Sequence, residues 1–265
     1  VSGSTLGIST YEVNLNGSIN LTGITAENIS GSTISGDTYF IGDTPLLDYL
    51  TGSTSVFTSG STGLFSIKAL NDTAIDATGD YAFASGYDNL ASGTASHAEG
   101  GFNGKFSDPT SATTFSSHAE GVGTLAAGNY SHAEGQSTKA LNVGDHSEGF
   151  FTVASGSYSH AEGGSTSASG NYAHAEGATT ISSGPASHAE GRQTLASGSS
   201  AHAEGRVTVA GGGESHAEGW GTSAIGAEAH AEGYFTTASG EDSHAQGLFT
   251  VASGDYAHAE GWNTT

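Results

Sequence analysis

The sequence predicts an all-β solenoid, in which short strands stack coil upon coil, and three observations support this prediction. From His118 onward the word Ser/Ala-His-Ala-Glu-Gly returns every 14 residues with few changes, and all 12 histidines of the chain occupy one position in it. Two Gly positions recur in each repeat, and small residues alternate with polar ones between them. Such a strict repeat is typical of proteins whose units bury their inner face only by stacking on their neighbours.

The composition fits narrow coils rather than a thick core. The 265 residues include 42 Gly, only 5 Lys and Arg together, and no Cys or Met. Average globular domains contain about 7% Gly and about 25% charged residues. Ala, Ser, Thr and Gly must therefore provide the packing. Disorder is the alternative for a chain rich in Gly and Ser, but the regular order of apolar, polar and Gly positions argues against it.

The charge and the hydropathy exclude several classes of protein. A formal net charge of −22 excludes a protein that binds nucleic acid or an anionic membrane. No apolar run approaches the roughly 20 residues of a membrane span, and no signal-peptide pattern opens the chain. The chain starts at Val1 and contains no Met, so we expect a fragment of a longer or processed polypeptide.

The chain divides into three predicted parts. Residues 1–50 lack the 14-residue period and contain short β-favouring runs, which predict a β-rich N-terminal connector. Around Pro45 the sequence allows either one or two helical turns or a short strand. Residues 51–78 are rich in Gly, Ser and Thr and are predicted to form a neck. The repeat array covers residues 79–265, and Phe83 takes the His position of its first coil, as expected of a cap.

An insertion interrupts the array near its start. The spacing from His97 to His118 is 21 residues rather than 14, and the extra residues lie within 101–117. Insertions into solenoids form loops on one face, so we predict a protruding loop. Loops on a rigid scaffold often carry binding, and a neutral insertion is the alternative. The candidate receptor contacts in this loop are Phe102, Asn103, Lys105 and Phe106.

Two strands of about five residues are predicted in each coil, because two Gly corners divide every 14 residues. Gly tolerates the left-handed backbone of such corners, and Asn142, which fills the first corner once, is the next residue to do so. Two strands are too few for a three-sided β-helix. They fit a flat, two-stranded roll.

Alternation assigns the faces of these strands, because neighbouring side chains on a strand point in opposite directions. Ser131 and Ala133 share one face of the first strand, and His132 and Glu134 share the other. On the second strand, Thr and Ala share a face. The small residues can meet inside a thin roll, so we expect the His/Glu face to point outward.

The His/Glu positions vary less between repeats than the outward positions of the second strand, which hold residues as different as Lys139 and Val153. Where the His position differs in the first coil, it holds Phe83. A surface that accepts Phe and otherwise keeps one pair is expected to be buried in an interface.

The 14-residue pattern from Gly79 to Trp262 resembles the head repeat of YadA-like trimeric adhesins, whose unit reads roughly Ser-Val-Ala-Ile-Gly where this chain has Ser-His-Ala-Glu-Gly. The resemblance implies a trimeric left-handed parallel β-roll solenoid whose Val and Ile positions face the three-fold axis. His and Glu depart from that apolar pattern. Similar repeats occur in phage tail-fibre proteins, and residues 37–46 look like a segment of such fibres.

By this resemblance, the His and Glu positions would form a ladder along the trimer axis. The ladder consists of His97, Glu99, His118, Glu120, His132, Glu134, His146, Glu148, His160, Glu162, His174, Glu176, His188, Glu190, His202, Glu204, His216, Glu218, His230, Glu232, His244, Gln246, His258 and Glu260.

Two chemistries suit this ladder. A trimer would gather three imidazoles in each layer, and three His are a known zinc set. The interpretation that we favour is that His and Glu hydrogen-bond across chains and between layers, so we predict no metal and no cofactor. The spacing differs from that of a zinc protease, no residue is set apart as a nucleophile, and we expect no enzyme. An ice-binding surface would need the recurring Thr residues to point outward, whereas alternation assigns them inward.

The expected function is therefore structural and adhesive. A phage tail fibre or virion spike that displays or forms a host-receptor-binding element is the first interpretation, and the head of a bacterial trimeric autotransporter adhesin is the alternative. We expect a homotrimer on a virion or a bacterial surface, with other fibre or virion proteins and a host receptor or glycan as partners. Outward aromatic residues near the corners are further candidate receptor contacts: Trp220, Tyr234 and Phe235.

Overall fold

The structure is a computed structural model that describes residues 40–41, 44–45, 57–69, 75–101 and 108–265. These residues form strands, turns and bends and contain no helix, which confirms the predicted all-β class. Accordingly, none of them belongs to a helix long and apolar enough to cross a membrane.

The chain divides into two units, Val1–Tyr49 and Leu50–Thr265. In the first unit, β1 (Phe40–Ile41) pairs antiparallel with β2 (Thr44–Pro45). Pro45 therefore lies in a short strand rather than in a helical turn. The rest of the predicted connector lies outside the described residues.

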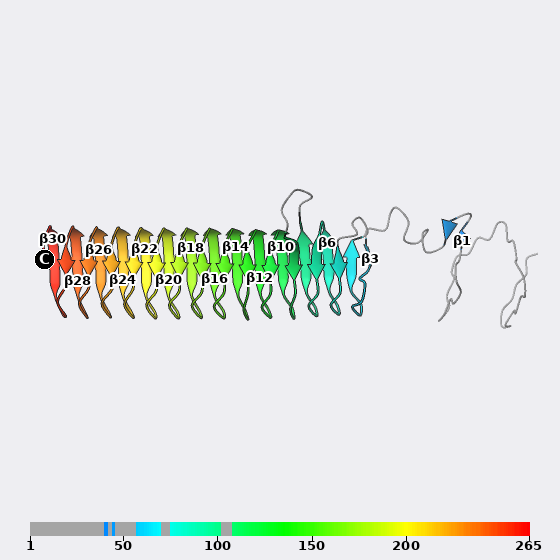
Figure 1. Cartoon of the computed structure of the whole chain (residues 1–265), viewed down its shortest axis with the longest axis horizontal. Coiled ribbons are helices and arrows are strands. Elements are labelled where there is room, and N and C mark those ends of the chain that lie inside the picture. The colour runs from blue at the N-terminus through cyan, green and yellow to red at the C-terminus, as the bar shows by residue number, and fades with distance from the viewer. Residues whose placement is uncertain (1–39, 42–43, 46–56, 70–74, 102–107) are drawn as a thin grey trace, which may run out of the picture. The chain divides into compact units, whose positions relative to one another are not determined.

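The second unit is a parallel β-solenoid whose coils repeat every 14 residues over most of its length (Figure 1). Each coil contributes one strand to each of two sheets. The 15-stranded sheet contains, in spatial order, β3 (Phe57–Ser59), β4 (Ile67–Ala69), β6 (Phe83–Gly86), β8 (His97–Gly100), β10 (His118–Val122), β12 (His132–Gln136), β14 (His146–Phe150), β16 (His160–Gly164), β18 (His174–Ala178), β20 (His188–Arg192), β22 (His202–Arg206), β24 (His216–Trp220), β26 (His230–Tyr234), β28 (His244–Leu248) and β30 (His258–Trp262).

The second sheet has 13 shorter strands, which run parallel to one another. It contains β5 (Asp76–Ala77), β7 (Asn89–Ala91), β9 (Thr110–Ala112), β11 (Leu125–Ala126), β13 (Lys139–Ala140), β15 (Val153–Ala154), β17 (Ser167–Ala168), β19 (Ile181–Ser182), β21 (Leu195–Ala196), β23 (Val209–Ala210), β25 (Ser223–Ala224), β27 (Thr237–Ala238) and β29 (Val251–Ala252).

The second strand of each coil is shorter than the predicted five residues, so that prediction is wrong for this sheet. The reason is that the corner begins immediately after the inward Ala. The amides of Ala127 and Gly128 both donate to the carbonyl oxygen of Ala140, at 2.8 and 3.3 Å. The chain therefore turns while its backbone is still paired with the next coil.

The buried core consists of small side chains, as the alternation predicts. The Ala residues of both sheets meet between them, and most, such as Ala133, have no exposed surface. From β11 onward, the Thr that precedes each strand of the second sheet is also buried, for example Thr138 and Thr152. One coil buries little apolar area by itself, so the core is stable only as a continuous stack.

The corners differ from the prediction in which residue adopts the left-handed backbone. At the first corner it is not the Gly but the residue two positions later, such as Tyr130 with φ 60° or Tyr158 with φ 59°. The Gly is needed for space instead, because a Cβ on Gly156 would overlap the carbonyl oxygen of Gly170. Asn142 likewise lies outside the left-handed region, and its side-chain amide donates to the carbonyl of Ser155.

The second corner follows the prediction. Gly135, directly after the Glu position, has φ 111°, and a Cβ there would overlap the carbonyl oxygen of Gly149 in the next coil. Both the backbone conformation and the close approach of two coils require Gly at this point.

Both sheets begin before Gly79, where the 14-residue pattern starts. β4 pairs parallel with β6, which places Ile67 opposite Phe83, and β5 pairs with β7. β3 pairs antiparallel with β4 at the end of the larger sheet. Part of the predicted neck thus belongs to the solenoid, and a further coil precedes that of Phe83.

The insertion leaves the register of the coils unchanged. β9 pairs with both β7 and β11, and β8 pairs with β10 so that His97 lies opposite His118. The extra residues therefore fall between Gly100 and Thr110. Residues 102–107, which include the four candidate receptor contacts of the predicted loop, lie outside the described residues.

Candidate functional site

The His and Glu positions form one continuous column on the outer face of the 15-stranded sheet. Parallel pairing places identical residues opposite each other, as in His132 against His146 and Glu134 against Glu148. The flanking Ser131 is buried, whereas His132 is partly exposed. This confirms that the His/Glu face points out of the roll. We call the twelve strands from β8 to β30 that carry it the His/Glu column.

The imidazole rings of the column are stacked. From His97 to His244, the centroids of successive rings are 4.6 to 4.9 Å apart and their planes differ by at most 22°. The last ring differs, because His258 is turned by 90° relative to His244 at a centroid distance of 4.9 Å. At the other end, Phe83 contacts His97 edge-on at 4.9 Å. Ile67 lies beyond Phe83 in the same position, so apolar residues occupy the N-terminal end of this face.

Each Glu lies near the His of its own strand over most of the column. The distance from His Nε2 to the Glu Oε2 is 3.2 Å at His97, 3.6 Å at His160 and 3.4 Å at His174. Toward the C-terminus the pairing shifts by one strand, because His230 lies 3.6 Å from Glu218 and His244 lies 3.8 Å from Glu232. The shift precedes β28, in which Gln246 replaces the carboxylate of the column.

Most of these contacts are not hydrogen bonds. Within the described residues, the Nε2 atoms of eleven histidines, from His97 to His244, are covered by neighbouring atoms and have no hydrogen-bond partner. Only His258, in the most exposed coil, is within hydrogen-bonding geometry of its Glu, at 3.4 Å from Glu260. A buried nitrogen without a hydrogen-bond partner carries a free-energy cost.

The column depresses the pKa of several of its histidines. Burial is the largest cause for His132 and His160, and the neighbouring imidazoles on both sides add to it, while the nearby carboxylates oppose both effects. The same causes lower the pKa of His188 and His216. These rings are therefore held toward their neutral form.

The carboxylates of the column interact with one another as well. Hydrogen bonds with Glu204 and Glu232 raise the pKa of Glu218 to about 7, and burial and the charges of the same two residues act in the same direction. Burial and a hydrogen bond with Glu204 raise the pKa of Glu190, while hydrogen bonds lower that of Glu204. Stacking carboxylates in register thus shifts the pKa values of neighbouring Glu residues in opposite directions.

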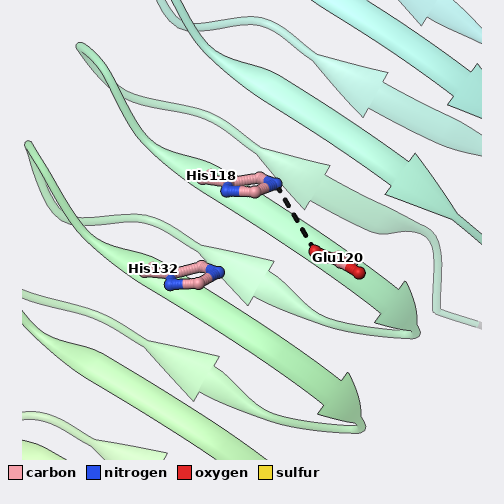
Figure 2. A group of neighbouring side chains, drawn as sticks. All are labelled: His118, Glu120 and His132. Atoms are coloured by element: carbon pink, nitrogen blue, oxygen red, sulfur yellow. Dashed lines mark ion pairs between the residues drawn. The ribbon is translucent and has the colours of Figure 1, made fainter.

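Two histidines and the carboxylate between them lie close enough to bind one metal ion together. His118, Glu120 and His132 each offer a ligand atom, and these three atoms lie within 4.8 Å of one another. Figure 2 shows the three side chains on one face, with His118 and Glu120 on one strand and His132 on the next. Equivalent triads include His160-Glu162-His174, His174-Glu176-His188, His188-Glu190-His202 and His202-Glu204-His216.

A second cluster joins the three aromatic residues that the sequence singles out. Trp220 and Tyr234 lie with ring centroids 4.9 Å apart, and Phe235 is 4.7 Å from Tyr234. Phe249 extends the cluster at 5.8 Å from Phe235, and the Arg206 guanidinium lies over Trp220 at 4.7 Å. We call these five residues the aromatic patch.

Arg206 is not among the receptor contacts predicted from the sequence, although its position in the repeat could have identified it. Arg206, Trp220, Tyr234 and Leu248 occupy the same position of successive repeats and are paired in register. Trp220 and Phe235 remain 40% and 44% exposed, so the patch can contact another molecule.

The comparisons with known proteins add no assignment: no protein-family model matches the chain, and no curated protein matches its sequence.

Proposed function

We propose that this chain is a structural segment of an extracellular adhesive fibre, of the kind found in a phage tail fibre or virion spike, and that it has no enzymatic activity. A repetitive solenoid with a narrow core of Ala and Thr suits an elongated spacer. Its coils are nearly identical, and the outward residues that differ between coils, such as those of the aromatic patch, can carry recognition.

The observation that carries this proposal is the incompletely covered His/Glu column. In one chain, the side chains of His132 and His160 are 34% and 33% exposed, and their Nε2 atoms have no hydrogen-bond partner. Ile67, at the apolar end of the same face, is 45% exposed. Three chains packed around an axis with this face inward would cover all of these residues and let His and Glu pair between chains.

In this proposal, the aromatic patch is the surface that contacts the receptor. Trp and Tyr are enriched where few residues carry most of the binding energy, and Arg is the third such residue. Three copies of the patch on one trimer would add avidity for a host-surface receptor or glycan. The predicted loop around residues 102–107 is a second candidate for this contact.

Two other functions are weighed against this one. A bacterial trimeric autotransporter head would use the same solenoid, and a coiled-coil stalk with a membrane anchor in the full-length gene would select it. An ice-binding surface is disfavoured, because Thr138 and Thr152 are completely buried and their hydroxyl groups cannot contact ice.

The mass of the chain in solution tests the trimer. Three chains of 26.3 kDa would give a particle of about 79 kDa in light scattering after gel filtration. A stable, monodisperse monomer would contradict the proposal, because the column would then remain uncovered.

A further inference from the structure

We propose that the His/Glu column binds divalent transition-metal ions of the Zn²⁺ class, each held by the Nε2 atoms of two histidines on adjacent strands and by a carboxylate oxygen of the Glu between them. All three ligands come from a single chain. The inference therefore does not depend on the trimer.

The spacing of the ligand atoms supports this site. Zn²⁺ binds imidazole nitrogen and carboxylate oxygen at about 2.0–2.2 Å, so two ligands of a tetrahedral ion lie about 3.3 Å apart. In the triads the Nε2 to Oε2 distance is 3.4 Å at His174, 3.6 Å at His160 and 3.9 Å at His118. An ion can therefore sit between the His and the Glu of one strand with shifts of a few tenths of an ångström.

The third ligand is the His of a neighbouring strand. In the triad of His118, Glu120 and His132, all ligand atoms lie within 4.8 Å of one another (Figure 2). The lone pairs of two stacked rings are parallel, so the second imidazole must turn toward the ion. The column already contains such a turned ring, because His258 is perpendicular to His244.

The unpaired Nε2 atoms of the His/Glu column also favour the binding of a cation. The Nε2 atoms from His97 to His244 have no hydrogen-bond partner among the described residues, and a neutral imidazole offers its lone pair at such an atom. The carboxylates lie in register along the same face, in a chain with a formal charge of −22. The sequence favours His–Glu hydrogen bonds across chains and between layers over metal; within the chain, a His–Glu hydrogen bond is formed only at His258 among the described histidines.

The ligand types select the class of ion. Imidazole suits Zn²⁺, Ni²⁺ and Cu²⁺, whereas Ca²⁺ and Mg²⁺ prefer six or more oxygen ligands. Two nitrogens and one carboxylate oxygen leave a fourth position for water or for a group of another chain. The column is therefore expected to retain Zn²⁺ in the presence of excess Mg²⁺.

The geometry also limits the number of ions. Consecutive triads share a histidine, as His174 does between the triads of Glu162 and Glu176. One Nε2 atom ligates one ion, so neighbouring triads cannot be filled together. Of the six such triads among the described residues, at most four share no histidine, so the chain is expected to hold three or four ions.

The experiment uses the full chain without a histidine tag, treated with a chelator and then dialysed against Zn²⁺ with excess Mg²⁺ at physiological ionic strength. We expect bound zinc to saturate at three or four ions per chain. We also expect bound Co²⁺ to give the intense visible absorption of a four-coordinate ion. Saturation below one ion per chain, or loss of the zinc to Mg²⁺, would overturn the inference.

Two variants that each remove four negative charges separate a built site from charge attraction. In the column variant, four carboxylates become amides: Glu162→Gln, Glu176→Gln, Glu190→Gln and Glu204→Gln. The control variant changes four exposed carboxylates of the corners: Glu214→Gln, Glu228→Gln, Glu241→Gln and Asp242→Asn. Gln246 shows that Gln fits the column.

The column variant should bind about two zinc ions fewer, because the five histidines from His160 to His216 supply two complete pairs, while the control variant should bind as much as the unchanged chain. Equal losses in both variants would contradict the inference. Circular dichroism verifies the fold of each variant. Mass measurements with and without Zn²⁺ keep the two proposals apart: a monomer that binds zinc contradicts only the trimer, and a trimer without zinc contradicts only the metal site.

Discussion

The imidazole rings of His146 and His160 lie with their centroids 4.7 Å apart and their planes within 1° of parallel. Residues 14 positions apart in sequence are thus direct neighbours in space, because the parallel strands β14 and β16 pair in register. The same relationship repeats along the column. It brings identical titratable groups together, and the following predictions depend on it.

The first prediction concerns pH. Burial and adjacent imidazoles hold the pKa of His118, His132 and His160 below the usual 6.5, although the carboxylates of the column oppose this shift. Because the unfolded chain binds protons more readily, the stabilising effect of neutral histidines is complete above about pH 6.5 and is lost as the pH falls below it. We expect the thermal midpoint of chelator-treated protein to fall between about pH 8 and about pH 5.

A substitution tests the cause of this pH dependence. His160→Phe places in the column a residue that Phe83 already shows to fit the position. The variant should lose less stability on acidification than the unchanged chain. A midpoint that stays constant over this pH range, or rises on acidification, would contradict the predicted role of the histidines.

The second prediction concerns the carboxylates. Neighbouring carboxylates raise the pKa of Glu218 to about 7, so its contribution to stability is present at low pH and is lost as the pH rises through about 7. Glu218→Gln removes this cost and should raise the thermal midpoint at about pH 8, with little effect at about pH 5.

The matched control is Glu260→Gln, which makes the same substitution in the exposed last coil, where the carboxylate side chain is 70% exposed. It should leave the midpoint nearly unchanged at both pH values. An equal gain in the two variants would attribute the effect to net charge rather than to stacking within the column.

The third prediction concerns the close approach of the coils. Gly163 has φ 102°, and a Cβ there would overlap the carbonyl oxygen of Gly177. Gly163→Ala should therefore destabilise the solenoid by about 1–3 kcal/mol, through strain and displacement of the next coil. Gly164, the next residue, has open space at the same atom, so Gly164→Ala is the control and should change the unfolding free energy little. Similar losses in both variants would be evidence against tight coil contact at Gly163.

The fourth prediction concerns recognition by the aromatic patch. Trp220→Ala together with Phe235→Ala should reduce binding of the labelled protein to receptor-bearing cells at least about tenfold, as expected of central contact residues. Tyr158→Ala is the control, because Tyr158 is an exposed aromatic residue that stacks on Tyr172 away from the patch. If both variants bind equally well, receptor contact lies elsewhere, and the loop around residues 102–107 becomes the next region to test.

The repeat period made most of the solenoid predictable. A fixed 14-residue spacing determines the register, and alternation then places Ala133 inside and His132 outside. The 14-residue period does not predict coils that have a different spacing. The coil of Ile67 is missed because Ile67 and Phe83 are 16 residues apart, although they are paired in the sheet.

The role of each corner residue was harder to predict. Gly is associated with left-handed backbone, yet at the first corner Tyr130 has that conformation, while a Cβ on Gly128 would overlap the backbone of Asn142. A left-handed backbone and a lack of space for a Cβ both favour Gly in a sequence. Only the path of the neighbouring coil shows which of the two applies.

The amino-acid sequence alone predicted the solenoid, its small-residue core and the outward His/Glu face, because each depends on spacing within one chain. How these groups contact one another depends on the folded chain. Stacking brings one ring nitrogen each of His118 and His132 and a carboxylate oxygen of Glu120 within 4.8 Å of one another, and it gathers Arg206 with Trp220. The physical reason is that side-chain orientation across adjacent strands depends on the rotamers and corners of both coils, which a one-dimensional pattern does not contain.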